Sequence, residues 1–189
     1  MFVYMAWKSR EAAAVWSRIA EKEPAGLIKD YITEIISSGR ILDIACGNGR
    51  NTSEISQKTG SLTMVDINPY LLKAAKSFAG ENSCYVNSDA RLLPFRDAAY
   101  DTILLIGVLQ SMNNTGKKSV LREACRVLGP GGILYSSAMG DSRTGRQGRY
   151  PFDSVDEFTH VHEECGFTIL GAAERADSHR LFYEGRFLK

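Results

Sequence analysis

The sequence predicts an α/β fold with a mostly parallel sheet, and three observations favour this class. Apolar segments of strand length alternate with segments of helical periodicity along most of the chain. A glycine-containing turn, residues 45–49, follows the first apolar segment of this alternation and precedes a helical one. Two apolar segments near the C-terminus are separated by too little chain for a crossover helix, so we expect them to form an antiparallel pair.

The composition is that of an ordinary globular protein. The 189 residues suit one domain, and we expect a single domain over residues 1–189. The net charge of +1 gives no overall basic field that favours nucleic acid, although a local patch could suffice. The apolar start of the chain is too short for a signal peptide or a membrane span. We therefore expect a cytoplasmic protein without membrane insertion.

The cysteines are far apart and show no CxxC pairing. This spacing argues against a zinc site and favours reduced thiols, so we expect no bound metal. The four residues are Cys46, Cys84, Cys125 and Cys165.

Residues 1–38 predict two N-terminal helices, 11–20 and 27–36, which could form a lid, and Gly39 is expected to cap the second. Residues 40–137 predict five strands with helices between them. The Gly-Pro-Gly-Gly segment 129–132 is expected to break the chain before the fifth strand. The predicted strands are 40–45, 61–66, 84–87, 100–108 and 133–137, and the predicted helices are 52–58, 68–78 and 115–128.

The C-terminal part has a different texture. Residues 139–150 are polar and rich in glycine and arginine, which predicts a mobile loop. Residues 153–188 predict a helix over 154–164 and the two strands 167–170 and 181–187. The arginines of the loop could bind a substrate phosphate or carboxylate, with a solvated loop as the alternative; they are Arg143, Arg146 and Arg149. We expect the two histidines of the helix, His160 and His162, on the surface.

The turn between the first strand and its helix is the first candidate binding element. Its sequence, Asp-Ile-Ala-Cys-Gly-Asn-Gly over residues 43–49, places Gly47 and Gly49 where a backbone can approach a ligand closely. Such a turn occurs in many nucleotide-binding folds, and on its own it is a weak signal.

Acidic residues after the next two strands make the pattern more specific. Asp66 ends the second strand about 20 residues beyond the turn, where an acid can accept hydrogen bonds from both hydroxyls of a ribose. Its alternative role is the N-cap of the following helix. Asp89, with Ala90, follows the third strand and could accept from an adenine amino group, or be a solvated loop acid. Ile106 ends the fourth strand, and we expect all these positions at one edge of the sheet.

Four stretches of the chain resemble the class I, seven-strand family of S-adenosylmethionine-dependent methyltransferases, of the kind called methyltransferase type 11. They are LDIACGNGR, VDINPYLLKAAK, SDARLLPFRDAAYDTILLIGVL and LREACRVLGPGGILY, in this order between residues 41 and 135. The resemblance implies a three-layer sandwich with strand order 3-2-1-4-5-7-6 and an antiparallel strand 7. It also implies S-adenosylmethionine as cofactor and a methyl transfer as the reaction.

The resemblance assigns the cofactor contacts by position. The methionine end of the cofactor is implied to contact the turn, the ribose to contact Asp66, and the adenine to pack on Ile67 and meet Asp89 with Ala90. Ile106 is implied to line the methionyl side. The turn residues are Asp43, Ala45, Cys46, Gly47, Asn48 and Gly49.

One position departs from the family pattern, because Ala45 stands where the family usually has glycine. A single methyl group still permits close approach of a ligand if φ stays negative, so Ala45 weakens the pattern a little without overturning it.

The methyl acceptor is not indicated by any one motif, and the catalytic residues stay unassigned. Gln110 and Ser111 occupy positions where many relatives carry a histidine pair facing the acceptor, and either could contact substrate or be solvated. The segment around them is also similar to tRNA methyltransferases that act on a wobble-uridine carboxymethyl group. A small-molecule acceptor fits as well, so small molecule and RNA both stay open, as does the oligomeric state.

Two other functions compete with methyl transfer. A dinucleotide-binding dehydrogenase is disfavoured because its glycine pattern would normally be GxGxxG. A non-catalytic partner subunit that binds S-adenosylmethionine is disfavoured by the intact set of Asp43, Asp66 and Asp89.

Overall fold

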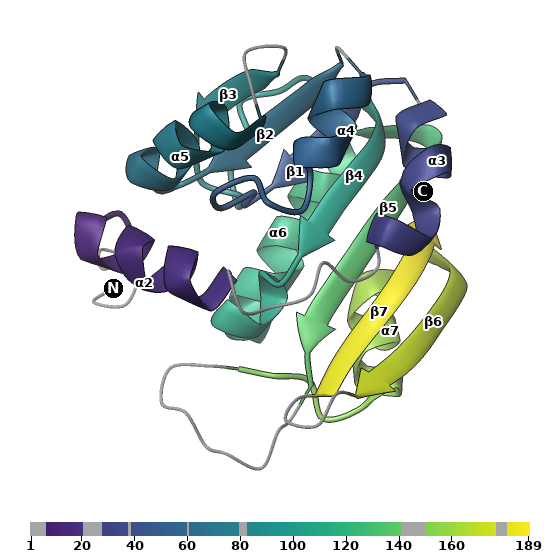
Figure 1. Cartoon of the computed structure of the whole chain (residues 1–189). Coiled ribbons are helices and arrows are strands. Elements are labelled where there is room, and N and C mark those ends of the chain that lie inside the picture. Colours follow the sequence, from purple (N-terminus) through teal and green to yellow (C-terminus); the bar gives the residue numbers. More distant parts are fainter. Residues whose placement is uncertain are drawn as a thin grey trace. The chain divides into compact units, whose positions relative to one another are not determined.

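A computed structural model of the chain describes residues 7–20, 28–37, 39–59, 61–79, 83–140, 150–176 and 181–189. Its strands form one seven-stranded sheet in the order β3-β2-β1-β4-β5-β7-β6 (Figure 1). The strand order, the mostly parallel directions and the antiparallel β7 are confirmed. The strands are β1 (Ile41–Ile44), β2 (Leu62–Asp66), β3 (Cys84–Asn87), β4 (Tyr100–Ile106), β5 (Leu128–Met139), β6 (Thr168–Ala176) and β7 (Leu181–Leu188).

The helices flank the sheet and agree with the predicted segments to within one or two residues. One short 3-10 helix, η1, follows β4. The helices are α2 (Arg10–Ala20), α3 (Ile28–Ser37), α4 (Ser53–Lys58), α5 (Pro69–Ala79), η1 (Leu109–Ser111), α6 (Asn114–Val127) and α7 (Val155–Glu163). Among the described residues, none of the helices combines the length and apolar character that a membrane crossing requires.

The chain divides into two compact units, Met1–Ala90 and Arg91–Lys189. In the first unit, β1 pairs in parallel with β2, and β2 with β3. Every residue of β1 is buried, as expected for a parallel strand that is covered on both faces. Because parallel strands end at the same edge of a sheet, the carboxyl ends of β1, β2 and β3 lie together in this unit. The candidate binding residues that follow these strands therefore lie at one edge.

In the second unit, β4 and β5 are parallel, and β7 runs antiparallel to both β5 and β6. α6 packs on β5, and α7 packs on β6 and β7. Aromatic rings pack against α7: Phe158 of α7 lies 5.8 Å from Phe187 of β7 and 5.2 Å from Phe152, which precedes α7, measured between ring centroids.

The predicted break at residues 129–132 is wrong, because β5 continues through this segment from Leu128 to Met139. Tyr100 of β4 pairs with Leu128, and Thr102 pairs with Ile133. Four residues of β5 therefore lie opposite one residue of β4. Glycine and proline are tolerated in a strand at such a bulge, since the ladder of hydrogen bonds is already interrupted there.

The expected surface position of His162 is also wrong, whereas His160 is exposed as expected. His162 is fully buried, and its ring stacks on Phe187 with a centroid distance of 4.0 Å. Its Nε2 lies 3.0 Å from Ser136 Oγ and its Nδ1 lies 2.7 Å from the carbonyl oxygen of Phe158. Because both ring nitrogens have partners, a polar ring can take a core position one helical turn after Phe158.

The last strand in the sheet order, β6, has a bulge of its own. Ile169 pairs with Phe187 and Gly171 pairs with Arg186, so Leu170 has no counterpart on β7. Most of β6 is exposed, including Leu170.

Candidate functional site

The turn between β1 and α4 adopts a backbone conformation that is unusual for side chains other than glycine. Ala45, Gly47 and Gly49 all have positive φ, at 57°, 58° and 78°. The condition named for tolerance of Ala45, a negative φ, is therefore not met. The left-handed region costs an alanine about 1–2 kcal/mol. The flanking hydrogen bond from Cys46 N to the Val65 carbonyl, at 2.9 Å, helps hold this conformation.

The two glycines of the turn face different surroundings. A Cβ on Gly49 would lie 2.8 Å from Met64 Cε and 3.2 Å from Ala75 Cβ, so this glycine permits the turn to pack against β2 and α5. A Cβ on Gly47 would meet no atom within 4 Å. Gly47 therefore borders open space, and the turn has one packed side and one side that a ligand can approach.

Asp66, at the end of β2, is buried and is tied to this turn. Its Oδ2 accepts a hydrogen bond from Gly47 N at 2.9 Å, and its Oδ1 accepts from Asn68 N at 2.8 Å. Burial raises the pKa of Asp66, and these hydrogen bonds oppose the rise. Asp66 is not the N-cap of α5, because the Asn68 side chain takes that role by accepting from Tyr70 N and Leu71 N.

Asp43 lies beside it in β1 and is also buried. Burial raises the pKa of Asp43 to about 7, and the nearby Asp66 charge adds to the rise. Thr52 Oγ1 donates to Asp43 Oδ2 at 2.9 Å, which favours the ionised form but does not outweigh burial. Within the described residues, no lysine or arginine forms a salt bridge with either acid.

The end of β3 is joined to the end of β2 by two hydrogen bonds to the Asp66 carbonyl oxygen. Asn87 Nδ2 donates at 2.9 Å and Ser88 N donates at 3.2 Å. These bonds bring Asp89, half-buried, and Ala90, buried, to the same edge as Asp66. Ile67 is half-buried there too. The edge of the first unit thus brings together all the predicted positions from Asp43 to Ala90.

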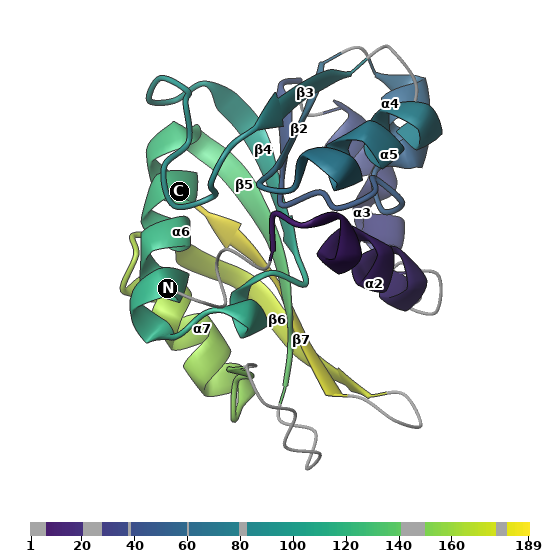
Figure 2. The same ribbon diagram turned by 90° about the vertical axis from the view of Figure 1, so that its left-hand side faces the viewer.

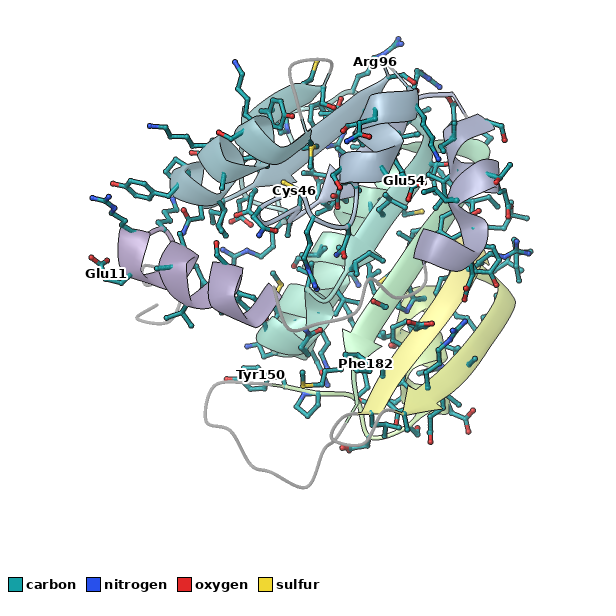
Figure 3. All side chains as sticks on the ribbon, in the orientation of Figure 1. Glu11, Cys46, Glu54, Arg96, Tyr150 and Phe182 are labelled. Carbon is teal, nitrogen blue, oxygen red and sulfur yellow. The ribbon has the colours of Figure 1, made fainter. Side chains whose placement is uncertain are left out.

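The remaining turn residues show no catalytic chemistry of their own. Cys46 is buried, its Sγ lies 3.6 Å from the Gly47 carbonyl oxygen, and burial raises the pKa of its thiol (Figure 3). A protonated thiol is a poor nucleophile. Asn48 is half-buried, and its Oδ1 accepts from Arg50 N at 3.3 Å, which stabilises the turn.

In the second unit, Ile106 is half-buried as the last residue of β4, and its contact with a cofactor stays a prediction. Gln110 is buried and not solvated: its Nε2 donates to the Gly107 carbonyl at 2.7 Å, and its backbone carbonyl accepts from Tyr150 N at 2.7 Å. Ser111 is half-buried. The three loop arginines, Arg143, Arg146 and Arg149, lie outside the described residues.

Three buried polar residues were missed from the sequence. Thr52 follows the glycine turn, and Asn68 precedes Pro69. Both are residue types that commonly cap helices, and this was the signal that could have identified them. Lys117 is only 2% exposed, and its Nζ lies 3.8 Å from the centroid of the Phe152 ring. No sequence pattern marked this lysine, because its partner lies 35 residues away.

The comparisons with known proteins agree with this geometry. A family model described as "Methyltransferase domain" matches residues 42–136. The chain is 28% identical over 165 residues to the biotin biosynthesis bifunctional protein BioHC of Cellvibrio japonicus, covering 86% of this chain and 32% of that protein. It is 36% identical over 112 residues to the ubiquinone/menaquinone biosynthesis C-methyltransferase UbiE of Pseudomonas aeruginosa, covering 54% of this chain and 43% of that protein.

Among solved structures, the fold is similar to that of a Burkholderia thailandensis 1,6-didemethyltoxoflavin-N1-methyltransferase with bound S-adenosylhomocysteine. The TM-score is 0.75 at 20% identity, covering 98% of this chain and 85% of that one. The chain spans less than half of the length of each of the two curated relatives above. Because the family model spans just over half of the 189 residues and the strand order agrees, the chain belongs to the class I family of S-adenosylmethionine-dependent methyltransferases.

Proposed function

We propose that the chain transfers the methyl group of S-adenosylmethionine to a small-molecule acceptor, and that the strand ends of the first unit bind the cofactor. The observation that carries this proposal is the pair of buried carboxylates, Asp43 and Asp66, beside a glycine turn that borders open space. Burial raises the pKa of both acids. A ligand that brings a cation and hydroxyl donors would offset the cost of burying them.

S-adenosylmethionine fits this donor and acceptor set. Each oxygen of an ionised carboxylate can accept two hydrogen bonds, and each Asp66 oxygen uses one on a backbone N–H, so capacity is left for two ribose hydroxyls. The amino group of the cofactor is a cation that can form a salt bridge with Asp43, for which the described residues supply no lysine or arginine partner. The open space at Gly47 leaves room for a ligand against the turn.

The roles proposed for individual residues follow this arrangement. The turn and Asp43 bind the methionine end, Asp66 binds the ribose, and Ile67 packs on the adenine, whose edge meets Asp89 and Ala90. When bound, the cofactor supplies an activated methyl group, so the chain's own task is to hold the acceptor in line with it. The turn residues concerned are Ala45, Cys46, Gly47, Asn48 and Gly49.

A small-molecule acceptor is supported by the names of the relatives, which act in quinone biosynthesis or on 1,6-didemethyltoxoflavin. We further propose that residues 1–189 act as one domain in the cytoplasm. The four cysteines are free thiols, which suits a reducing compartment.

Titration calorimetry with S-adenosylhomocysteine tests the cofactor assignment. We expect binding by the intact protein, none of NAD, and a loss of about 10-fold or more in affinity for Asp66→Asn, because its hydrogen bonds to the ribose would no longer be charge-assisted. Glu54→Gln, which removes an exposed carboxylate from α4, is the matched control and should bind as the original does. Equal binding by both variants would exclude Asp66 as the ribose ligand.

Transfer of labelled methyl from S-adenosylmethionine to separate metabolite, tRNA and protein fractions tests the acceptor class. We expect label in the metabolite fraction only. Label in tRNA would overturn the small-molecule proposal in favour of RNA modification. Cofactor binding without label in any fraction would instead identify a non-catalytic binding module.

A further inference from the structure

The segment before α2 is tied to the first unit by one buried side chain. Asn68 is 1% exposed, and its Nδ2 donates to the carbonyl oxygens of Trp7 and Ser9, at 2.6 and 2.9 Å. These bonds join residues about sixty positions apart in the sequence. α2 contacts α5, the helix that Asn68 precedes, and two views show the two helices as neighbours (Figure 1, Figure 2).

The same asparagine also contacts the proposed ribose ligand. Its backbone N–H donates to Asp66 Oδ1 at 2.8 Å, while its Oδ1 caps α5 through Tyr70 N and Leu71 N. Both amide hydrogens and the side-chain oxygen are therefore in use. A shift of the Asp66 carboxylate has to be accommodated at Asn68, and a shift of Asn68 has to be accommodated at the carbonyl groups of Trp7 and Ser9.

The residues before α2 are joined to the helix by a cap and a ring contact. Ser9 Oγ accepts from Ala12 N at 3.0 Å, which makes Ser9 the N-cap of α2. The rings of Trp7 and Trp16 lie with their centroids 5.3 Å apart, one before the helix and one within it. These are the only two tryptophans in the sequence, so the intrinsic tryptophan fluorescence of the protein reports on this segment alone.

We propose that Asn68 is a positioning residue that couples cofactor binding at Asp66 to the N-terminal segment, Trp7–Ala20. The proposal rests on the proposed function, because it takes Asp66 as the ribose ligand. Hydroxyl donors at Asp66 fix the carboxylate, Asn68 passes this constraint to the two carbonyl groups, and the segment is held more firmly. Coupling free energies are reciprocal, so an ordered segment in turn raises the affinity for the cofactor.

Tryptophan emission, excited at a wavelength where adenine does not absorb, is titrated with S-adenosylhomocysteine and compared with calorimetry. We expect an emission change that saturates with the calorimetric Kd. Asn68→Ser keeps a capping hydroxyl on α5 but is too short to reach both carbonyl groups. It should lose the emission change and bind about tenfold more weakly. Asn68→Asp keeps the cap and replaces the donor by an acceptor. It should give the same result as Asn68→Ser and serves as the test if Asn68→Ser fails to fold.

A pair of cap variants separates coupling from general destabilisation. Ser9→Ala removes the cap of α2, and Ser154→Ala removes the equivalent cap of α7, where Ser154 Oγ accepts from Glu157 N at 3.0 Å. Both should lower thermal stability similarly, but only Ser9→Ala should weaken S-adenosylhomocysteine binding, by about threefold.

The outcomes are distinct. Calorimetric binding without any emission change, or equal affinities for Ser9→Ala and Ser154→Ala, would overturn the coupling and leave the proposed function standing. Absence of calorimetric binding by the intact protein would overturn both.

Discussion

Both units bury polar side chains, but the two units differ in the interactions that offset the cost of this burial. In the second unit, the buried His162 and Gln110 find hydrogen-bond partners within the protein, and the Nζ of Lys117 lies over an aromatic ring. In the first unit, Asp43 and Asp66 are buried next to each other without a described salt bridge, and burial raises the pKa of both.

This difference distinguishes buried polar groups that stabilise one packing arrangement from buried polar groups whose partners we expect a ligand to supply. A buried group with its full set of partners costs little and fixes one packing arrangement. Two neighbouring carboxylates with raised pKa values reduce stability at neutral pH, and such a cost is typical of binding sites. Four sets of variants test this contrast.

The largest effect is expected for Asp43→Asn. Because the pKa of Asp43 in the folded state lies near 7, above the ordinary 3.8, the folded state binds this proton more tightly and stability falls as pH rises from about 4 to about 7. The variant should gain up to about 4 kcal/mol at pH 8 relative to the original, with little gain at pH 4. Urea unfolding at both pH values measures this.

The same variant should bind S-adenosylhomocysteine about 10- to 100-fold more weakly, because a charge-assisted contact with its amino group is lost. Glu54→Gln should change neither property. A variant that gains no stability at pH 8 would mean that Asp43 is compensated in the free protein, and the contrast between the units would fail.

The next effect concerns His162. Burial lowers the pKa of this histidine from 6.5 to about 4. The unfolded state takes up a proton before the folded state does, so this residue removes up to about 3 kcal/mol of stability as pH falls from about 6.5 to about 4. The sign is opposite to that of Asp43, so the pair is best compared in the Asp43→Asn background. There, His162→Gln should flatten the acid limb of the stability profile, and His160→Gln, on the exposed side of α7, should leave it unchanged.

The two glycines of the turn should respond differently to alanine. Gly49→Ala places a Cβ against Met64 and Ala75 at positive φ, and should cost about 2–3 kcal/mol in denaturant unfolding. Gly47→Ala meets only the backbone penalty of about 1 kcal/mol, but its methyl group enters the open space and should weaken cofactor binding more than its stability loss explains. Equal loss of stability in the two variants would show that Gly47 is packed as well.

The smallest effect is expected for Ala45→Gly, which relieves the positive φ of 57°. Stability should rise by about 0.5–1 kcal/mol, as thermal unfolding would show. Ala98→Gly, with a φ of 53° in the second unit, is the matched control and should gain a similar amount. A loss of stability at Ala45 alone would mean that its methyl group makes contacts that outweigh the strain.

Much of the fold could be predicted from the sequence, because apolar periodicity reports burial directly. It located all seven strands, and the resemblance to a known family was needed only for their order. The candidate acids were also found, since Asp66 ends an apolar strand and Asp43 lies within another, just before the glycine turn. What periodicity cannot show is how a polar residue is satisfied: His162, Lys117 and Asn68 depend on partners distant in the sequence, and the φ of Ala45 depends on the backbone around it.

The bulge at Leu170 has a consequence for how copies of this protein meet. A strand at the end of a sheet offers its free N–H and C=O groups as a template on which another chain can build. In β6 the extra residue breaks the even spacing of those groups near the start of an exposed strand. The small side chains of β6 would otherwise leave this strand flat and open to pairing with a strand of another copy. The bulge at Leu170 therefore disfavours the edge-to-edge pairing by which copies would assemble into filaments.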